Sequence, residues 1–203
     1  MPWPTALPLV AILRGITPAE AVAHGRVLLD AGFDTIEVPT NSPQWADSVH
    51  ALVRLAPQAL VGAGTVLSAV HLDALALAGG RLAVSPHTDT ALVAESVRRG
   101  FTALPGAMTP SEVFAAAHAG ATAVKIFPAS TLGPGHVKAL RAVLPRELPL
   151  LAVGGVSPAN LGEWMAAGCT GAGLGSELYK PGQAPEVTAR QAAAFVDAYR
   201  RAA

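Results

Sequence analysis

Short apolar runs recur along the chain, and a longer segment of mixed polarity separates each run from the next. A run of three to five apolar residues bounded by turn residues is typical of a strand buried in a parallel sheet. The eight runs are Leu9 to Leu13, Thr35 to Val38, Leu60 to Ala63, Leu82 to Val84, Thr102 to Leu104, Ala123 to Phe127, Leu150 to Val153 and Gly171 to Leu174. The pattern predicts eight parallel strands.

The segments between the runs carry the signals of helix ends. A glycine just before the next apolar run is typical of a helix C-terminus, and it recurs in Ala31-Gly32, Ala78-Gly79, Arg99-Gly100, Ala119-Gly120 and Ala167-Gly168. Thr17-Pro18 and Thr109-Pro110, each followed by a glutamate at the third helical position, are typical of a helix start. We expect Ser42-Pro43 and Ser157-Pro158 to open helices in the same way.

Each strand and the helix after it form one repeat of 20 to 28 residues. Eight such repeats predict an α/β fold, a single (β/α)8 TIM barrel with parallel strands and outer helices, covering residues 1–203 as one domain. An open doubly wound sheet is the alternative, but such sheets rarely contain eight repeats of such even length.

Composition narrows the partners of this barrel. Only 14% of residues are charged and 51% are hydrophobic, which indicates an oligomer that covers part of its apolar exterior. The net charge is zero without blocks of like charge, so neither nucleic acid nor a membrane is an expected partner. The start lacks a secretory signal pattern, and the single cysteine, Cys169, suits a reducing compartment, so we expect a cytoplasmic protein.

Lys125 interrupts the apolar run Ala123 to Phe127, where a charge is costly unless it is used. Burial disfavours the charged form of an amine and lowers its pKa, which leaves free amine to attack a carbonyl and form a Schiff base. A lysine whose stem reaches from the strand end into water is the alternative interpretation.

Glu37 is the polar exception in its own run, Thr35 to Val38. It lies on the second predicted strand and Lys125 on the sixth, and alternate strands of a barrel contribute side chains to the same interior layers. The two side chains are therefore expected to converge at the catalytic end, for proton transfer. A buried structural ion pair is the alternative.

Two glycine-rich turns follow the last two predicted strands. Val153-Gly154-Gly155-Val156 ends the seventh strand, and Gly173-Leu174-Gly175-Ser176 ends the eighth. Glycines let backbone N–H groups approach an anion, and these two loops form the recurrent phosphate site of such barrels. Ordinary tight turns are the alternative.

Two further features suit a substrate that bears a carboxylate. Gly62-Ala63-Gly64-Thr65 offers backbone donors and a hydroxyl, and Arg14 follows the first predicted strand, where its guanidinium can pair with a carboxylate in a bidentate manner. Ordinary loop roles are the alternative for both. A metal site is not expected, since the six histidines are scattered and lack ligand spacing.

These motifs together resemble the 2-keto-3-deoxy-6-phosphosugar aldolases, the KDPG and KDPGal class I aldolases, along essentially the whole chain. The stretches that carry the resemblance are Ala11-Ile12-Leu13-Arg14-Gly15-Ile16, Ile36-Glu37-Val38-Pro39, Gly62-Ala63-Gly64-Thr65, Pro105-Gly106, Val124-Lys125-Ile126-Phe127-Pro128, Val153-Gly154-Gly155-Val156 and Gly173-Leu174-Gly175-Ser176. The resemblance implies a homotrimeric lyase, without a cofactor, that cleaves a phosphorylated 2-keto-3-deoxy acid to pyruvate and D-glyceraldehyde 3-phosphate.

The resemblance also implies roles for individual residues. Lys125 would be the Schiff-base lysine, with Glu37 as the acid and base that relays protons. Substrate-binding roles would fall to Arg14 and Thr65 for the carboxylate of pyruvate, and to Gly154, Gly155, Gly175 and Ser176 for the phosphate.

Two positions distinguish the branches of this family. The gluconate branch typically carries an arginine four residues after the glutamate and a threonine just before the glycine pair, where this chain has Asn41 and Val153. With Arg14, these departures favour the galactonate branch, because the valine removes a hydroxyl that could bond a substrate hydroxyl at C4. His87 also departs from the family pattern, which leaves the lining near the fourth strand open.

Three other functions are compatible with some of these motifs. The gluconate epimer is the alternative substrate. A phosphosugar epimerase or decarboxylase would share the phosphate loops but normally needs further carboxylates or a metal. A phosphometabolite sensor without catalysis would keep only the pocket.

Overall fold

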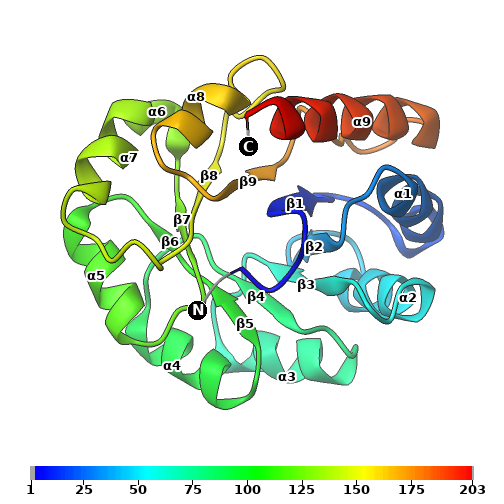
Figure 1. Cartoon of the computed structure of the whole chain (residues 1–203). Coiled ribbons are helices and arrows are strands. Elements are labelled where there is room, and N and C mark those ends of the chain that lie inside the picture. Colours follow the sequence, from blue (N-terminus) through cyan, green and yellow to red (C-terminus); the bar gives the residue numbers. More distant parts are fainter. Residues whose placement is uncertain (1–2, 203) are drawn as a thin grey trace.

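The computed structural model describes residues 3–202, which form a parallel α/β barrel (Figure 1). The strands pair only in parallel, in the order β5-β4-β3-β2-β1-β9-β8-β7-β6. Their bounds are β1 Leu9–Ile12, β2 Thr35–Pro39, β3 Leu60–Gly64, β4 Leu82–Val84, β5 Thr102–Leu104, β6 Gly106–Ala107, β7 Val124–Ile126, β8 Leu150–Val153 and β9 Gly171–Leu174. The predicted barrel and all eight predicted strands are confirmed.

The fifth predicted strand continues further than expected. It is split at Pro105, which has no N–H to donate to a ladder, into β5, which pairs with β4, and β6, which pairs with β7. The two ends of the sheet are thus joined by one residue of chain. The Lys125 N–H of β7 also donates to the carbonyl of Pro105 itself, at 2.9 Å, so β7 bonds the residue at which the strand is split.

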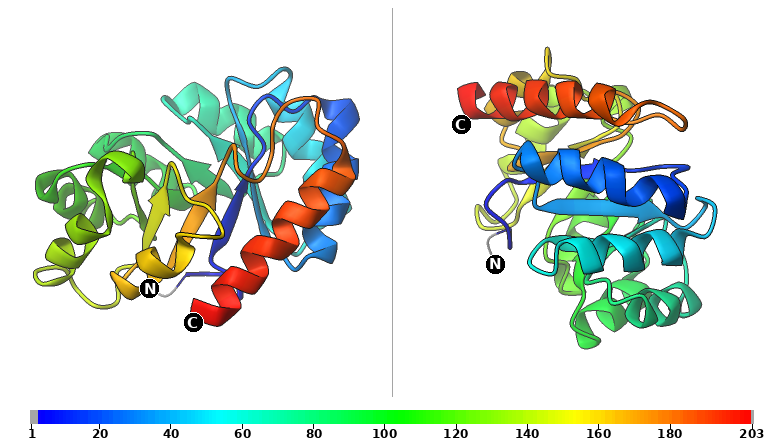
Figure 2. Two further views of the ribbon diagram at one scale, coloured as in Figure 1. Left: turned by 90° about the horizontal axis from the view of Figure 1, so that it is seen from above. Right: turned by 90° about the vertical axis from the view of Figure 1, so that its right-hand side faces the viewer.

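Helices surround the ring of strands (Figure 1). Their bounds are α1 Pro18–Asp30, α2 Trp45–Leu55, α3 Ala69–Leu77, α4 Thr90–Arg98, α5 Pro110–His118, α6 Ala129–Leu132, α7 Pro134–Arg141, α8 Leu161–Ala166 and α9 Pro185–Ala202. Helix α9, the longest, packs against α1 and α8, so the last helix lies beside the first in the outer layer (Figure 2). Among the described residues, no helix is long and apolar enough to cross a membrane.

The predicted helix ends are confirmed, but two of the predicted starts are wrong. The five glycines Gly32, Gly79, Gly100, Gly120 and Gly168 all have positive φ, as expected after a helix C-terminus.

Helices α1 and α5 begin with the expected capping boxes. Helix α2 begins later than Ser42-Pro43, at Trp45, because the Ser42 hydroxyl bonds the Gly15 N–H of another loop. Helix α8 begins at Leu161, after a turn in which the Ser157 carbonyl accepts from the Asn160 and Leu161 N–H groups.

Strand alternation divides the core into two parts. One large cluster lies between the sheet and the helices and includes Ile36, Val38, Val124 and Ile126. A smaller cluster fills the barrel interior with Trp3, Val10, Leu60, Leu82, Val84, Leu104, Ala123 and Leu151. Since neighbouring strand residues face opposite sides, Glu37 and Lys125 must face the interior, next to this smaller cluster.

Candidate active site

Lys125 lies in the middle of β7 and is only 7% exposed. Burial lowers the pKa of its amine. The Glu37 carboxylate opposes this effect, and the Arg14 guanidinium adds to it. Its Nζ lies 4.9 Å from the centroid of the Phe127 ring, which gives the charged form some cation–π stabilisation. The net shift favours the free amine that nucleophilic attack requires.

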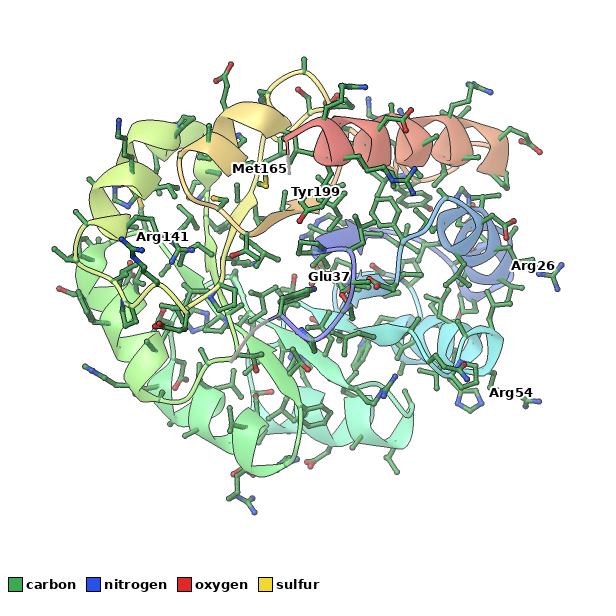
Figure 3. The ribbon with its side chains drawn as sticks, in the orientation of Figure 1. Arg26, Glu37, Arg54, Arg141, Met165 and Tyr199 are labelled. Atoms are coloured by element: carbon green, nitrogen blue, oxygen red, sulfur yellow. The ribbon has the colours of Figure 1, made fainter. Side chains whose placement is uncertain are left out.

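Glu37 lies on β2 and is 3% exposed (Figure 3, near the middle of the ring of strands). Burial raises the pKa of its carboxyl, while the positive charges of Lys125 and Arg14 oppose the rise. Its Oε2 is buried without a hydrogen-bond partner. A buried oxygen left in this way is costly in a purely structural carboxyl, which favours a functional role for Glu37.

The two residues influence each other's pKa without forming a direct ion pair. Within residues 3–202, ion pairs closer than 4.0 Å occur only among Asp73, Glu95, Arg98 and Arg99, on α3 and around the end of α4. The alternative of a buried structural ion pair therefore does not describe Lys125. Instead, both pKa shifts favour a neutral amine and a neutral carboxylic acid.

A cavity of about 140 Å³ opens at the carboxyl ends of β1, β8 and β9. It is lined by Ile12, Arg14, Phe127, Val153, Gly154, Gly155, Val156, Gly173, Gly175, Ser176 and Glu177. Six residues predicted as substrate-binding, Arg14, Val153, Gly154, Gly155, Gly175 and Ser176, thus meet in one place.

The two buried catalytic candidates adjoin this cavity rather than line it. The Lys125 amine faces the ring of Phe127, and Glu37 is paired in register with Ile12, and both partners line the cavity. Neither Ile12 nor Phe127 had been predicted as a site residue. Their place directly beside the functional side chains, on the same strand or the neighbouring one, was the only available signal.

The loop after β8 has a backbone that only glycine adopts readily. Gly154 and Gly155 both have positive φ, at 101° and 73°. A missed residue, Asn160, supports this loop from the start of α8, since its side chain donates to the Gly155 carbonyl at 2.9 Å and accepts from the Ser157 N–H at 2.8 Å.

Arg14 and Thr65 occupy different strand ends. The Arg14 side chain is exposed at the end of β1, where its Nη1 donates to Asn41 Oδ1 at 2.8 Å. Thr65 follows β3 with a φ of 57° and is half-buried, but it does not line the cavity with Arg14. Only Arg14 of these two is therefore brought to the cavity.

His87 lies apart from this site. It is exposed and lines a separate open hollow with Thr88, Asp89 and Glu112 at the starts of α4 and α5. Within residues 3–202, no three His, Cys, Asp or Glu side chains are grouped as a metal site would require.

Known proteins match both the sequence and the fold of this chain. The family model described as KDPG and KHG aldolase matches residues 4–191. The 2-dehydro-3-deoxy-6-phosphogalactonate aldolase of Escherichia coli K12 is 55% identical over 203 residues, which cover 100% of this chain and 99% of that protein.

Two solved structures are equally similar. One described as native KDPGal has a TM-score of 0.97 at 55% identity, covering 100% of this chain and 98% of that one. A designed cube-shaped protein cage, built by fusing symmetric oligomeric domains, has a TM-score of 0.95 at 55% identity, covering 98% of this chain and 74% of the cage chain. The chain belongs to the KDPG and KHG aldolase family and is a class I lyase.

Proposed function

We propose that this enzyme reversibly cleaves 2-dehydro-3-deoxy-6-phospho-D-galactonate to pyruvate and D-glyceraldehyde 3-phosphate through a Schiff base on Lys125. The observation that carries the proposal is a buried amine with a lowered pKa inside the barrel, next to a cavity that bears an arginine and two glycine loops. The similarity to the Escherichia coli galactonate enzyme supports this substrate.

In the first half of the reaction, the free amine of Lys125 attacks the C2 ketone carbon and forms a carbinolamine. The Glu37 carboxylic acid protonates the departing hydroxyl, which leaves as water, and a protonated imine remains. Burial supports both groups in this step, because it lowers the pKa of the amine and raises the pKa of the carboxyl.

In the second half, the Glu37 carboxylate takes the proton of the C4 hydroxyl and the C3–C4 bond breaks. The electron pair of that bond moves into the imine to give an enamine, while C4 leaves as the aldehyde carbon of glyceraldehyde 3-phosphate. Glu37 returns the proton to C3. Water then hydrolyses the imine to pyruvate and the free amine, and the released proton restores the carboxylic acid.

The ends of the substrate are assigned to separate parts of the site. Arg14 binds the carboxylate by charge-assisted hydrogen bonds, with Thr65 on the far side of β2 as the second carboxylate residue. Gly154, Gly155, Gly175 and Ser176 bind the phosphate through backbone N–H groups and a hydroxyl.

Val153 is proposed to select the C4 epimer. Its side chain lines the cavity one residue before Gly154 and offers no hydrogen bond to a substrate hydroxyl. Comparing kcat/KM for the galactonate and gluconate epimers in wild type and Val153→Thr tests this role. We expect the galactonate epimer to be preferred by wild type and the preference to shrink in the variant, whereas faster wild-type cleavage of the gluconate epimer would refute the assignment.

Borohydride reduction in the presence of pyruvate tests the central chemistry. We expect irreversible inactivation with one reduced pyruvate adduct, located on Lys125 by peptide mass spectrometry. Lys125→Arg is the matched variant, because it keeps the positive charge but cannot form an imine. Labelling of Lys138 or Lys180 instead, or no labelling, would support a phosphosugar epimerase, a decarboxylase or a sensor.

The assembly is proposed to be a homotrimer in the cytoplasm. The chain is poor in charge, and large apolar side chains are exposed on and before α3, with Leu77 88% exposed alongside Leu67 and Val70. Such surface is typical of an interface between subunits. The molar mass from light scattering during size-exclusion chromatography tests the trimer, and a monomer or dimer mass would refute it.

A further inference from the structure

We propose that the loop after β2, Thr40-Asn41-Ser42, is a positioning bridge that holds both carboxylate-binding residues in place from the gap between them. This inference rests on the proposed function, which assigns the pyruvate carboxylate to Arg14 and Thr65. The bridge residues act through these two and are not themselves assigned contact with the substrate.

On one side, the bridge is tied to the loop after β1 by two hydrogen bonds. Asn41 Oδ1 accepts from Arg14 Nη1 at 2.8 Å, and Ser42 Oγ accepts from the Gly15 N–H at 2.9 Å. Arg14 is exposed, and the long side chain of an arginine samples many rotamers in water. The bond to Asn41 restricts the guanidinium, and the bond to Ser42 restricts the backbone that carries it.

On the other side, the bridge is tied to the end of β3. The Thr40 hydroxyl donates to the Thr65 carbonyl at 2.7 Å, and the Thr40 N–H donates to the Gly64 carbonyl at 2.8 Å. Thr65 has a φ of 57°, which a β-branched residue rarely adopts and which its surroundings must maintain. The bond from Thr40 is one of the contacts that maintain it.

The bridge itself is held in a tight turn. The Ser42 N–H donates to the Pro39 carbonyl at 2.8 Å, which closes a four-residue turn directly after β2, and Ser42 is 6% exposed. The same strand, β2, carries Glu37. Glu37 and the bridge that holds the two carboxylate-binding residues are therefore supported by one strand and the turn that follows it.

The chemistry of residue 41 suits this role. An amide oxygen orients the guanidinium while leaving its charge free for the substrate carboxylate. An aspartate at position 41 would instead pair with Arg14 and compete with the substrate carboxylate. An arginine at position 41 would repel the Arg14 guanidinium. A neutral acceptor is therefore what a positioning residue requires here.

The experiment compares trapping of pyruvate with trapping of methyl pyruvate, which has the same ketone but no carboxylate. For each enzyme, the concentration that gives half-maximal borohydride inactivation is measured with both compounds. The variants are Asn41→Ala, Asn41→Asp, Thr40→Val and Thr40→Ser. The control is Ser96→Ala, which removes a buried hydroxyl-to-carbonyl bond to Leu92 within α4, away from the site.

We expect Asn41→Ala and Thr40→Val to raise the half-maximal concentration of pyruvate about tenfold, because each variant misplaces a residue that makes a charge-assisted hydrogen bond to the pyruvate carboxylate. The half-maximal concentration of methyl pyruvate should change by less than about twofold. Asn41→Asp should raise the half-maximal concentration of pyruvate at least as much as Asn41→Ala does. Thr40→Ser keeps the hydroxyl, so its half-maximal concentration of pyruvate should be close to that of wild type. Ser96→Ala should leave the half-maximal concentrations of both compounds unchanged.

Equal effects on the two compounds, or none on either, would overturn the bridge while leaving the Schiff base established. If wild type itself fails to trap pyruvate, the proposed function falls, and the bridge falls with it. The Asn41 and Thr40 variants break different hydrogen bonds, so one variant that fails to fold leaves the other as the test.

Discussion

At the scale of single residues, the important property is the environment that surrounds each ionisable group. The position of Lys125 in an apolar run and the position of Glu37 in another were enough to predict that both face the barrel interior, and both do. The sequence could not predict the sign of the lysine shift, because burial and the nearby carboxylate act in opposite directions. In the structure burial is the larger effect, since the carboxylate is not in direct contact.

This balance predicts how the pH dependence of imine formation changes in Glu37→Gln. The Glu37 carboxylate raises the pKa of Lys125, so its removal lets that pKa fall further. The rate rises with pH as the amine loses its proton, and we expect this rising limb to move to lower pH, whatever the loss in maximal rate. The rate of pyruvate trapping measured across pH in wild type and Glu37→Gln checks this.

The control for this experiment is Glu95→Gln, which removes a half-buried carboxylate on α4, away from the site, and should leave the limb unchanged. A limb that moves to higher pH in Glu37→Gln would show that the carboxylate does not stabilise the protonated lysine.

A second residue-scale prediction concerns Gly64 at the end of β3. A Cβ atom there would lie 2.6 Å from Glu37 Oε1 and 2.8 Å from its Cδ, so Gly64→Ala must displace the carboxyl. We expect kcat for aldol cleavage to fall about tenfold to a hundredfold, because proton transfer depends on sub-ångström placement. The half-maximal pyruvate concentration for borohydride trapping should change much less. Steady-state kinetics with the phosphorylated substrate measure kcat, and trapping measures the pyruvate concentration.

Gly135→Ala is the matched control for Gly64→Ala. Gly135 lies in α7 with no atom within 4 Å of an added Cβ, so the change should leave kcat unchanged and slightly stabilise the helix. An unchanged kcat in Gly64→Ala would show that the Glu37 carboxyl can move without loss of function.

At the scale of elements, local signals predicted strands and helix ends well but helix starts less well. The C-terminal glycines were recognisable because each needs positive φ, a property of the residue itself. Ser42 and Ser157 looked like N-caps, yet Ser42 bonds Gly15 from another loop and Ser157 bonds Asn160. For Ser42 the partner is distant in the chain, and no local pattern contains it. The same reason hid the roles of Thr40 and Asn41.

The loop after β8 yields a prediction about one end of the substrate. In Gly155→Ala, the new Cβ would lie 2.7 Å from the Ser130 Cβ at a φ of 73°, so the loop must shift. We expect KM for the phosphorylated substrate to rise about tenfold, from loss of one or two backbone bonds to the phosphate. Trapping of pyruvate, which has no phosphate, should remain as in wild type. A parallel loss of pyruvate trapping would show that the loop supports the whole site and not the phosphate alone.

At the scale of the whole molecule, the number of repeats predicted the barrel, but the manner of its closure was not predictable. The fifth strand changes partners at Pro105, from β4 to β7, and this depends on the curvature of the complete ring. The shared cavity likewise depends on that ring, since Arg14 and Ser176 are far apart in sequence and meet only when β1 lies beside β9. Strand order in a barrel made the meeting predictable, whereas distances and hydrogen bonds required coordinates.

The barrel interior away from the cavity yields a prediction about global stability. Trp3 is 8% exposed and packs in the interior cluster with Val10 and Leu60, and its Nε1 donates to Thr5 Oγ1 at 2.8 Å. Trp3→Ala should lower the free energy of unfolding by about 3–5 kcal/mol, since a large cavity would replace the indole. Urea denaturation followed by circular dichroism measures the loss.

The half-buried Trp45 on α2 is the control, and Trp45→Ala should cost clearly less, because less of its surface is removed from water on folding. Pyruvate trapping by folded Trp3→Ala should stay close to wild type, because Trp3 is not one of the residues that line the cavity. If Trp3→Ala instead lost trapping while remaining stable, the interior cluster, which includes the register partner of Lys125, Leu151, would have to position the lysine as well as stabilise the fold.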